Sequence, residues 1–108
     1  MKLWTVAPAL LILAAAPGEP LPTKAEVPER VGQALARRLG DELVSVHLDK
    51  VLPSQDLPGF VACGRATEKR GDQAETTERF FVVVPGSFAV LDRDGTSLVD
   101  LYWTRYGC

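Results

Sequence analysis

The chain has 108 residues, of which 46% are hydrophobic, and its formal net charge is -2 at pH 7 with one histidine. A chain of this length folds as one domain and not two. Its acidic and basic residues are interspersed, so no basic surface for nucleic acid is expected.

The N-terminal segment has the layout of a secretory signal peptide. Lys2 precedes the uncharged apolar run LWTVAPALLILAAA, residues 3–16, and small residues follow it. This run is shorter than the about 20 apolar residues that a membrane span needs, which favours cleavage over an anchor. Cleavage after Ala16 or after Gly18 fits the small residues, and Gly18 is favoured because Pro17 directly follows Ala16. The sequence therefore predicts a periplasmic or secreted protein with no membrane span in its mature part.

The chain is accordingly divided into three parts. Residues 1–18 are the predicted signal peptide, residues 19–27 a proline-rich linker, and residues 28–108 a single domain. About 90 residues remain after cleavage. A domain of this size has a thin core and often carries a covalent link.

A helix is predicted for residues 28–39. Pro28 suits the first turn of a helix and Gly40 suits a C-terminal cap. The apolar residues of this stretch recur at spacings of three and four, which leaves one face to be buried: Val31, Ala34, Leu35 and Leu39.

Residues 43–52, LVSVHLDKVL, fit two structures. Apolar residues alternate with polar ones, which is typical of a half-buried strand: Val44, Val46 and Leu48. Leu39, Leu43 and Val46 also fall at helical spacing, so the helix could extend into this stretch. The strand is slightly favoured, and the helical alternative stays open.

The second half of the chain indicates an antiparallel sheet. Residues 60–69 and 78–84 are rich in strand-forming residues and flank the polar RGDQAETT, as the two arms of a hairpin do. PGS then leads into residues 88–92, and RDG leads into a last predicted strand, residues 97–106. The expected fold class is α+β, with one N-terminal helix packed on a small antiparallel sheet of about four to five strands.

The two cysteines, Cys63 and Cys108, are expected to form a disulfide, because disulfides persist in the compartments to which exported proteins go. Closing a loop of about 46 residues stabilises a fold by roughly 4 kcal/mol in the chain-entropy model. Free thiols or an intermolecular bridge are the alternatives. The role of the disulfide is predicted to be structural, since a redox pair lies close in sequence as Cys-x-x-Cys.

Several features follow one another along the chain: the signal peptide, the short helix, Cys63 with Gly64, the strand around Arg79, Phe80 and Phe81, and Trp103 before Cys108. In this order of features the chain resembles a group of small exported bacterial proteins of uncharacterised function. The resemblance implies export and a compact domain with one disulfide, and it implies no catalytic residue. In that group a loop rich in Gly and Asn follows the Cys-Gly pair, whereas the loop here is charged.

Two sets of residues are candidates for a recognition surface. Arg70, Gly71 and Asp72 spell Arg-Gly-Asp at the predicted hairpin tip, where a receptor could reach the tripeptide, although Gly-Asp is also ordinary turn chemistry. The second set consists of aromatic residues that either pack in the core or form an exposed patch: Tyr102, Trp103 and Tyr106.

Metal binding and catalysis find little support in the sequence. Asp92, Asp94 and Gly95 resemble the start of a calcium loop, but the third ligand and the closing Glu are absent, so an Asp-Gly hairpin turn is expected. The lone histidine, His47, has no free cysteine to activate if both cysteines are paired. No catalytic residue, cofactor or metal site is therefore predicted.

Two classes of function stay open. The favoured one is a non-enzymatic binding or inhibitory module for another macromolecule, either a protein or a cell-envelope component. The alternative is a small carboxylate-dependent hydrolase. A cleft lined by convergent carboxylates with perturbed pKa values would favour the enzyme, and a convex surface with an exposed aromatic patch would favour the binding module.

Export is the first testable prediction. Protein recovered from the cell envelope or the medium should lack the apolar N-terminal run, because the signal peptide is removed during secretion. Intact-mass spectrometry measures this directly. A mass that still includes residues 1–16 would contradict the prediction.

Overall fold

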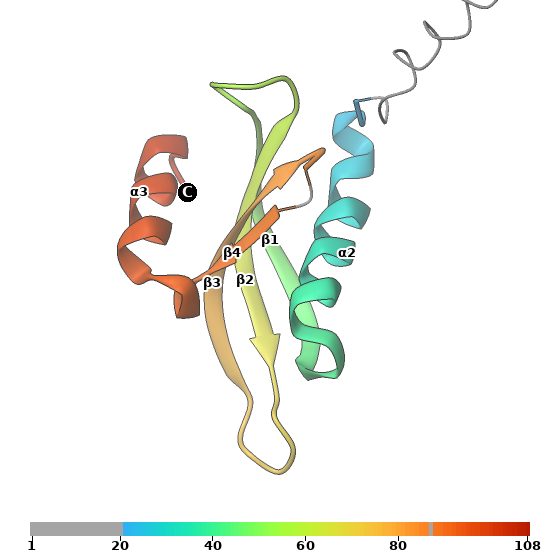
Figure 1. Cartoon of the computed structure of the whole chain (residues 1–108), viewed down its shortest axis with the longest axis vertical. Coiled ribbons are helices and arrows are strands. Elements are labelled where there is room, and N and C mark those ends of the chain that lie inside the picture. Colours follow the sequence, from blue (N-terminus) through green and yellow to red (C-terminus); the bar gives the residue numbers. More distant parts are fainter. Residues whose placement is uncertain (1–20, 87) are drawn as a thin grey trace, which may run out of the picture.

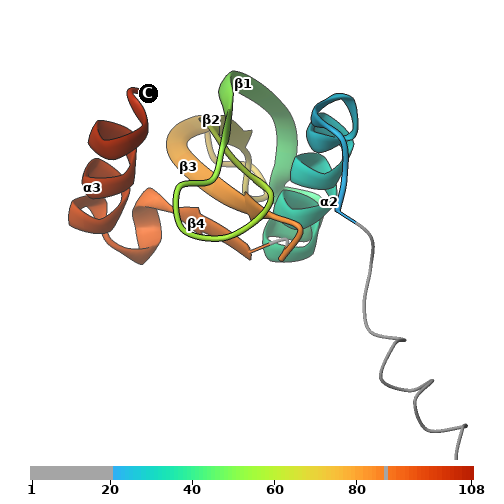
Figure 2. The same cartoon turned by 90° about the horizontal axis from the view of Figure 1, so that it is seen from above.

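Two helices lie on opposite faces of an antiparallel sheet in the computed structural model, which describes residues 21–86 and 88–108 (Figures 1 and 2). The predicted signal peptide lies outside the described residues. Within them the helices are α2 (Val27–Leu39) and α3 (Thr96–Tyr106), with short 3-10 turns η2 (Lys24–Glu26), η3 (Gly40–Glu42) and η4 (Asp92–Asp94). The strands are β1 (Leu43–Pro53), β2 (Phe60–Glu68), β3 (Thr76–Val84) and β4 (Phe88–Leu91). They pair in the order β1-β2-β3-β4, each antiparallel to its neighbour. The predicted α+β fold is confirmed.

Helix α2 has the bounds and the buried face that its sequence predicts. It begins at Val27, one residue before the predicted start, with Pro28 in the first turn. Gly40 ends the helix with a positive φ of 57° and donates its N–H to the carbonyl oxygen of Ala36. The apolar face is buried against the sheet: Val27, Val31, Ala34, Leu35 and Leu39. Burying each larger aliphatic side chain contributes about 1.5–3 kcal/mol, so this contact holds the helix in place.

Residues 43–53 form a strand, which decides between the two predicted alternatives. The register of β1 against β2 shifts twice, at Val44 and at Asp49, and each shift inserts one extra residue as a β-bulge. Val46 and Leu48 therefore point toward α2 as alternation predicts, whereas Val44 is 51% exposed.

The sheet separates two hydrophobic clusters. On the α2 side, Phe80 and Val82 of β3 pack with Ala62 and Ala66 of β2. On the α3 side, Phe81 packs with other apolar residues and with the disulfide. Strand β3 is thus buried on both faces at its centre.

The last predicted strand is wrong, because residues 97–106 belong to helix α3. Three residues that pack on the sheet, Val99, Tyr102 and Trp103, recur at helical spacing with the buried Tyr106. Gly95, with φ 146°, precedes the helix, and Gly107, with φ 71°, ends it. The β-branched and aromatic residues suggested a strand, but a strand would bury only every second residue and leave one side of β3 uncovered.

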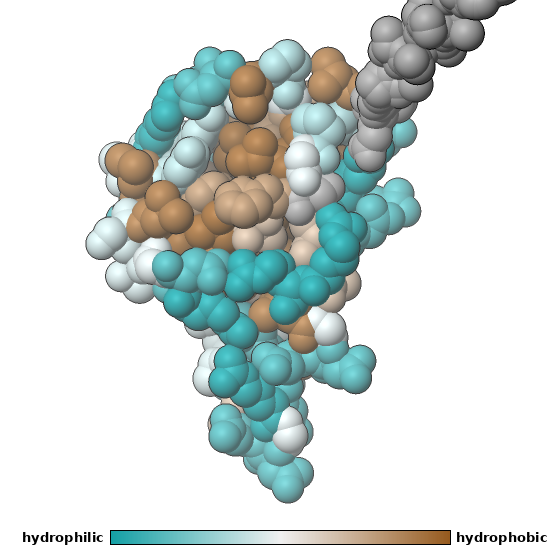
Figure 3. All heavy atoms as spheres, in the orientation of Figure 1, coloured by the Kyte–Doolittle hydropathy of each residue, from teal (hydrophilic) through white to brown (hydrophobic). Residues whose placement is uncertain are grey.

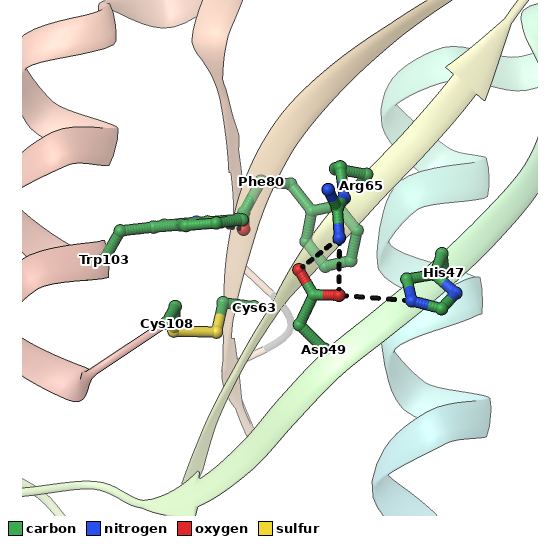
Figure 4. The surroundings of a disulfide bond; sticks show 7 residues. All are labelled: His47, Asp49, Cys63, Arg65, Phe80, Trp103 and Cys108. Atoms are coloured by element: carbon green, nitrogen blue, oxygen red, sulfur yellow. Dashed lines mark hydrogen bonds and ion pairs between the residues drawn. A yellow bond between two sulfur atoms is a disulfide. The ribbon is translucent and has the colours of Figure 1, made fainter.

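Helix α3 is attached to the sheet by aromatic contacts and by the disulfide (Figure 4). Trp103 Nε1 donates a hydrogen bond of 3.0 Å to the carbonyl oxygen of Phe80. The ring of Tyr102 stacks on Phe81 with 4.1 Å between centroids. The predicted Cys63–Cys108 disulfide is confirmed, and its Cα atoms lie 6.5 Å apart. The disulfide joins Cys108, which follows α3 and its cap Gly107, to Cys63 in the middle of β2.

The disulfide generates a stability prediction. Replacing both cysteines with alanine should lower the melting temperature by many degrees, because the chain-entropy model gives roughly 4 kcal/mol for this loop and each kcal/mol corresponds to about 4–8 °C in a domain of this size. Thermal unfolding followed by circular dichroism measures the change. Titration of the denatured, unreduced wild-type protein serves as the control and should find no free thiol. An unchanged melting temperature would contradict the structural role.

Candidate functional site

A pocket of about 300 Å³ lies at the base of the β2–β3 hairpin. We call it the carboxylate pocket, and its lining residues are Glu68, Arg70, Gln73, Ala74, Thr76, Glu78 and Arg93. They come from the end of β2, the hairpin loop, the start of β3 and the turn η4. The pocket therefore joins the body of the domain to its hairpin.

Glu68 occupies a position that alternation assigns to the hydrophobic core. Ala62 and Ala66 precede it on the same face of β2, and both are buried beneath α2. The Glu68 side chain is only 4% exposed. Glu78 stands in the equivalent place on β3, two residues before the buried Phe80. The hairpin register pairs Ala66 with Glu78, so the two glutamates are diagonal neighbours on one face.

Arg93 connects the two glutamates. Its Nη2 atom lies 2.8 Å from Glu78 Oε2 and also forms an ion pair with Glu68 Oε1. Its Nε atom and its backbone N–H each donate a 2.9 Å hydrogen bond to Glu78. Glu78 is therefore held from two directions, whereas Arg93 contacts Glu68 through one oxygen only.

The second oxygen of Glu68 has no such contact. Oε2 is buried and accepts no hydrogen bond from any described residue. A buried polar atom without a partner costs about 1–3 kcal/mol, so the oxygen requires a proton or a ligand.

The two glutamates differ in their affinity for protons. Burial raises the pKa of Glu68 to about 7, helped by a hydrogen bond shared with Glu78 and by the charge of Glu78, against the opposing effect of Arg93. Burial also acts to raise the pKa of Glu78, but the hydrogen bonds from Glu68 and from the backbone and guanidinium of Arg93 outweigh it and lower that pKa. Glu68 thus holds the proton of the pair, and Glu78 carries the charge.

A second arginine ties the hairpin to the body of the domain. Arg70 Nε donates a hydrogen bond of 3.2 Å to Glu42 Oε1 in η3. The backbone N–H of Lys69 donates a 2.8 Å bond to the carbonyl oxygen of Glu42. Arg93 lies 3.9 Å from the same Glu42 carboxylate. Three carboxyl groups therefore face two guanidinium groups, and one shared proton balances their charges.

The structure separates the residues predicted as a recognition surface. Arg70, Gly71 and Asp72 are exposed in the loop between β2 and β3, while the three aromatic residues lie on α3 (Figure 1). Tyr106 is only 7% exposed, and its hydroxyl accepts a 3.1 Å hydrogen bond from the backbone of Gln55. Tyr102 and Trp103 are half-buried against the sheet. Of the predicted residues, Arg70 also lines the carboxylate pocket.

His47 lies on the exposed part of β1 beside the β-bulge at Asp49. Its Nε2 atom is 3.2 Å from Asp49 Oδ1, and Arg65 Nη2 is 2.9 Å from the same oxygen (Figure 4). A histidine with a neighbouring carboxylate can act as a base for a nucleophile, and a cysteine thiol would be one such group. Both cysteines are in the disulfide and provide no thiol.

The predicted Asp-Gly hairpin turn is wrong, because η4 leads into a helix. Asp92 accepts a 2.9 Å hydrogen bond from Arg79 Nη2, and Asp94 pairs with Arg38 Nη1 at 2.8 Å. Asp94 also accepts a 2.9 Å bond from the backbone of Leu91. These carboxylates therefore hold β4 and η4 against β3 and α2. Within the described residues, no three His, Cys, Asp or Glu side chains converge as a metal site.

The carboxylate pocket was missed at the level of sequence, although one signal pointed to it. Alternation from Ala62 through Ala66 puts Glu68 on the core side of its strand, where a charged residue needs a partner. Arg93 follows Glu68 by 25 residues, and nothing in the local pattern links the two. Only the packing of η4 against the hairpin brings them together.

Comparisons with protein-family models, with curated proteins and with solved structures find no match to this chain. Among the described residues, no helix is long and apolar enough to cross a membrane. The geometry of the chain itself therefore carries the functional argument.

The raised pKa of Glu68 predicts that stability falls as pH rises. Between the ordinary value of 4.5 and about 7, the folded protein binds more protons at this site than the unfolded chain does. The free energy of unfolding must therefore decrease across this window. Urea unfolding at a series of pH values should show a decline of at most about 3 kcal/mol, since the window from 4.5 to about 7 covers about 2.5 pH units and each unit corresponds to about 1.4 kcal/mol.

In the variant Glu68→Gln, the free energy of unfolding should change less with pH between 4.5 and about 7. Glutamine does not titrate, and its amide can still donate a hydrogen bond to Glu78. The lowered pKa of Glu78 acts at the acidic end of the scale, where stability is lost as pH falls. Glu75→Gln in the exposed hairpin loop is the matched control and should keep the wild-type slope. Equal slopes for Glu68→Gln and wild type would contradict the assignment.

Proposed function

We propose that the protein is a non-enzymatic binding module of the periplasm or the medium, which binds another macromolecule through the β2–β3 hairpin and the carboxylate pocket at its base. The observation that carries this proposal is the exposed and charged loop of the β2–β3 hairpin, which ion pairs of Arg70 and Arg93 hold at its base. A partner of complementary charge can contact this loop and the polar residues of the pocket at its base.

The shape of the hairpin supports this proposal. It extends beyond the helices at the lower end of the molecule in Figure 1, and Figure 3 shows hydrophilic side chains over it. Residues 69–77 are all exposed, and four of them carry charges: Lys69, Arg70, Asp72 and Glu75. The base of the hairpin is held by the ion pairs of Arg70 and Arg93. A loop held in this way loses little conformational freedom on binding, which favours affinity.

The proposed compartment rests on the disulfide and on the N-terminal sequence. Disulfides persist where the environment is oxidising, and the Cys63–Cys108 disulfide is such a link. The signal-like segment at residues 1–18 and the resemblance to small exported bacterial proteins point the same way.

One observation favours a carboxylate-dependent hydrolase as the second candidate. Glu68 and Glu78 have pKa values shifted in opposite directions, as an acid and a base in an active site do. However, two carboxyl groups that share a proton are closer than the about 5 Å that separates the pair in retaining glycosidases. Arg93 also contacts both of them, and the Glu68 side chain is 4% exposed. This arrangement supports binding better than hydrolysis, because a reacting bond has no room between the two groups.

The proposal predicts a hairpin-dependent partner. The immobilised protein should retain a component of the source organism's envelope extract, and the variant Lys69→Ala/Arg70→Ala/Asp72→Ala should retain it about thirtyfold less, since truncating hot-spot residues costs ~2 kcal/mol and every 1.4 kcal/mol is tenfold. Quantitative mass spectrometry of the retained material measures this ratio.

The control variant Arg37→Ala removes an exposed charge from α2, on a different part of the surface. It should retain the component as the wild type does. Equal retention by the wild type and the hairpin variant would contradict the proposed binding surface. Hydrolysis of envelope material that is lost in Glu68→Gln would favour the second candidate instead.

A further inference from the structure

We propose that the base of the β2–β3 hairpin is a pH-sensitive hinge, which keeps the hairpin loop attached to η3 and η4 while Glu68 and Glu78 share a proton. Loss of that proton releases the loop, residues 69–75, which follows the last pair of the two strands, Glu68 and Thr76. The hinge is a property of the fold and requires no ligand in the carboxylate pocket.

The first step of the argument is the place of Glu68 in the chain. It is the last residue of β2 and is paired with Leu43 of β1 and with Thr76 of β3. Its side chain is 4% exposed, whereas every residue from 69 to 77 is exposed. Glu68 is therefore the last buried residue before the loop, and the ends of strands are places where hinges lie.

The second step is the set of contacts that attach the loop to the body of the domain. The backbone N–H of Lys69 donates a 2.8 Å hydrogen bond to the carbonyl oxygen of Glu42. Arg70 also pairs with the Glu42 carboxylate, but both side chains are more than a third exposed, so this ion pair holds the loop weakly. The buried contact is that of Arg93 with Glu68. The attachment of the loop therefore depends on the state of Glu68.

The third step is the effect of removing the proton. While Glu68 is protonated, it shares a hydrogen bond with Glu78, and the guanidinium group of Arg93 balances one carboxylate. Without the proton, two carboxylates lie side by side in a buried site, and Arg93 can neutralise only one of them. Water can hydrate the ionised Glu68 only if the structure that covers it moves.

The hairpin is the part that moves, because η4 is fixed on both sides. Asp92 pairs with Arg79 of β3 at 2.9 Å, and Asp94 pairs with Arg38 of α2 at 2.8 Å. The loop depends instead on the weaker contacts at Glu42. Loss of the proton should therefore displace the loop and leave η4 in place.

The direction of the pH effect follows from the charged groups around Glu68. They are Glu78 of β3, Arg93 of η4, Glu42 of η3 and Arg70 of the loop, with the ion pair of Arg38 of α2 and Asp94 farther out. Burial and Glu78 raise the pKa of Glu68 to about 7, against the effect of Arg93. The attached loop thus holds the proton more tightly than a released loop, in which the pKa of Glu68 returns toward its ordinary 4.5. Release should become easier as pH rises from 4.5 to about 7, and should change no further above it.

The test is amide hydrogen exchange measured by NMR between pH 5 and pH 8, expressed as protection relative to an unfolded chain at the same pH. The amide of Lys69 donates to Glu42, and that of Arg93 donates to Glu78. Protection of the Lys69 amide should fall by at most about tenfold per pH unit up to about pH 7 and then stay level, because one proton is released on opening. The amide of Cys108, which donates to the carbonyl oxygen of Trp103 on the α3 side, should keep its protection.

In Glu68→Gln, protection of the Lys69 amide should stay at its acid-pH level throughout, whereas the matched control Glu75→Gln should follow the wild type. Where Glu68→Gln does not fold, as judged by circular dichroism, Glu78→Gln serves as the second variant. It removes one of the two like charges, so the fall in protection should begin at lower pH. Constant protection of Lys69 in the wild type would overturn the inference. An equal fall at Cys108 would also overturn it, because the change would then belong to unfolding of the whole domain.

The consequence of the hinge for binding rests on the proposed function. A held loop loses less conformational freedom on binding, so retention of a hairpin-dependent partner should be greater at pH 6 than at pH 8, by at most about tenfold. Glu68→Gln should remove this difference. Loop release without any retained partner would overturn the binding module and leave the hinge standing. A hairpin-dependent partner together with constant protection of Lys69 would overturn the hinge and leave the binding module standing.

Discussion

The rest of the structure depends on the burial of β3 from both sides. Phe80 and Phe81 are consecutive, so their side chains point to opposite faces of the sheet, and both are nearly inaccessible to solvent. A sheet with apolar side chains on both faces needs a cover on each. Helix α2 covers one face, and α3 covers the other over β3 and β4. The C-terminal segment forms a helix because that face of the central strand must be covered.

The same constraint positions the candidate site. To cross from β4 to the far face, the chain turns through η4, and this turn holds three charged residues in succession. Asp92 pairs with Arg79 of β3, Asp94 pairs with Arg38 of α2, and Arg93 reaches the glutamates at the base of the hairpin. The segment that begins α3 therefore also supplies the cation of the carboxylate pocket. Packing of the second helix and electrostatics of the pocket are physically linked through these three residues.

Much of the fold could be predicted because the signals were local. The buried stripe of α2 from Val31 to Leu39 has helical spacing, and Pro28 and Gly40 define its ends. The two arms of the hairpin follow from strand-forming residues on either side of a polar loop. Predicting α3 required weighing spacing against residue type: Val99, Trp103 and Tyr106 favour strands by type and a helix by spacing.

Other features depended on contacts between distant residues and could not be predicted. The bulge that exposes Val44 arises from the register of β1 against β2 and not from the sequence of β1 alone. The pocket requires that residues 68, 78 and 93 meet, and this depends on the path of the chain after β4. Alternation indicates only that Glu68 is a carboxylate on a buried face.

The position of Glu68 itself lowers the stability of the fold. An alanine there would continue the series of Ala62 and Ala66 beneath α2 and would need no partner. A glutamate at the same place must keep a proton or find a cation, and burial of an unpaired carboxylate costs free energy in either case. Arg93 offsets part of that cost through one oxygen, and the hydrogen bond shared with Glu78 offsets more of it. The glutamate pair is therefore tolerated at a core position because Arg93 contacts both carboxyl groups and one of them keeps a proton.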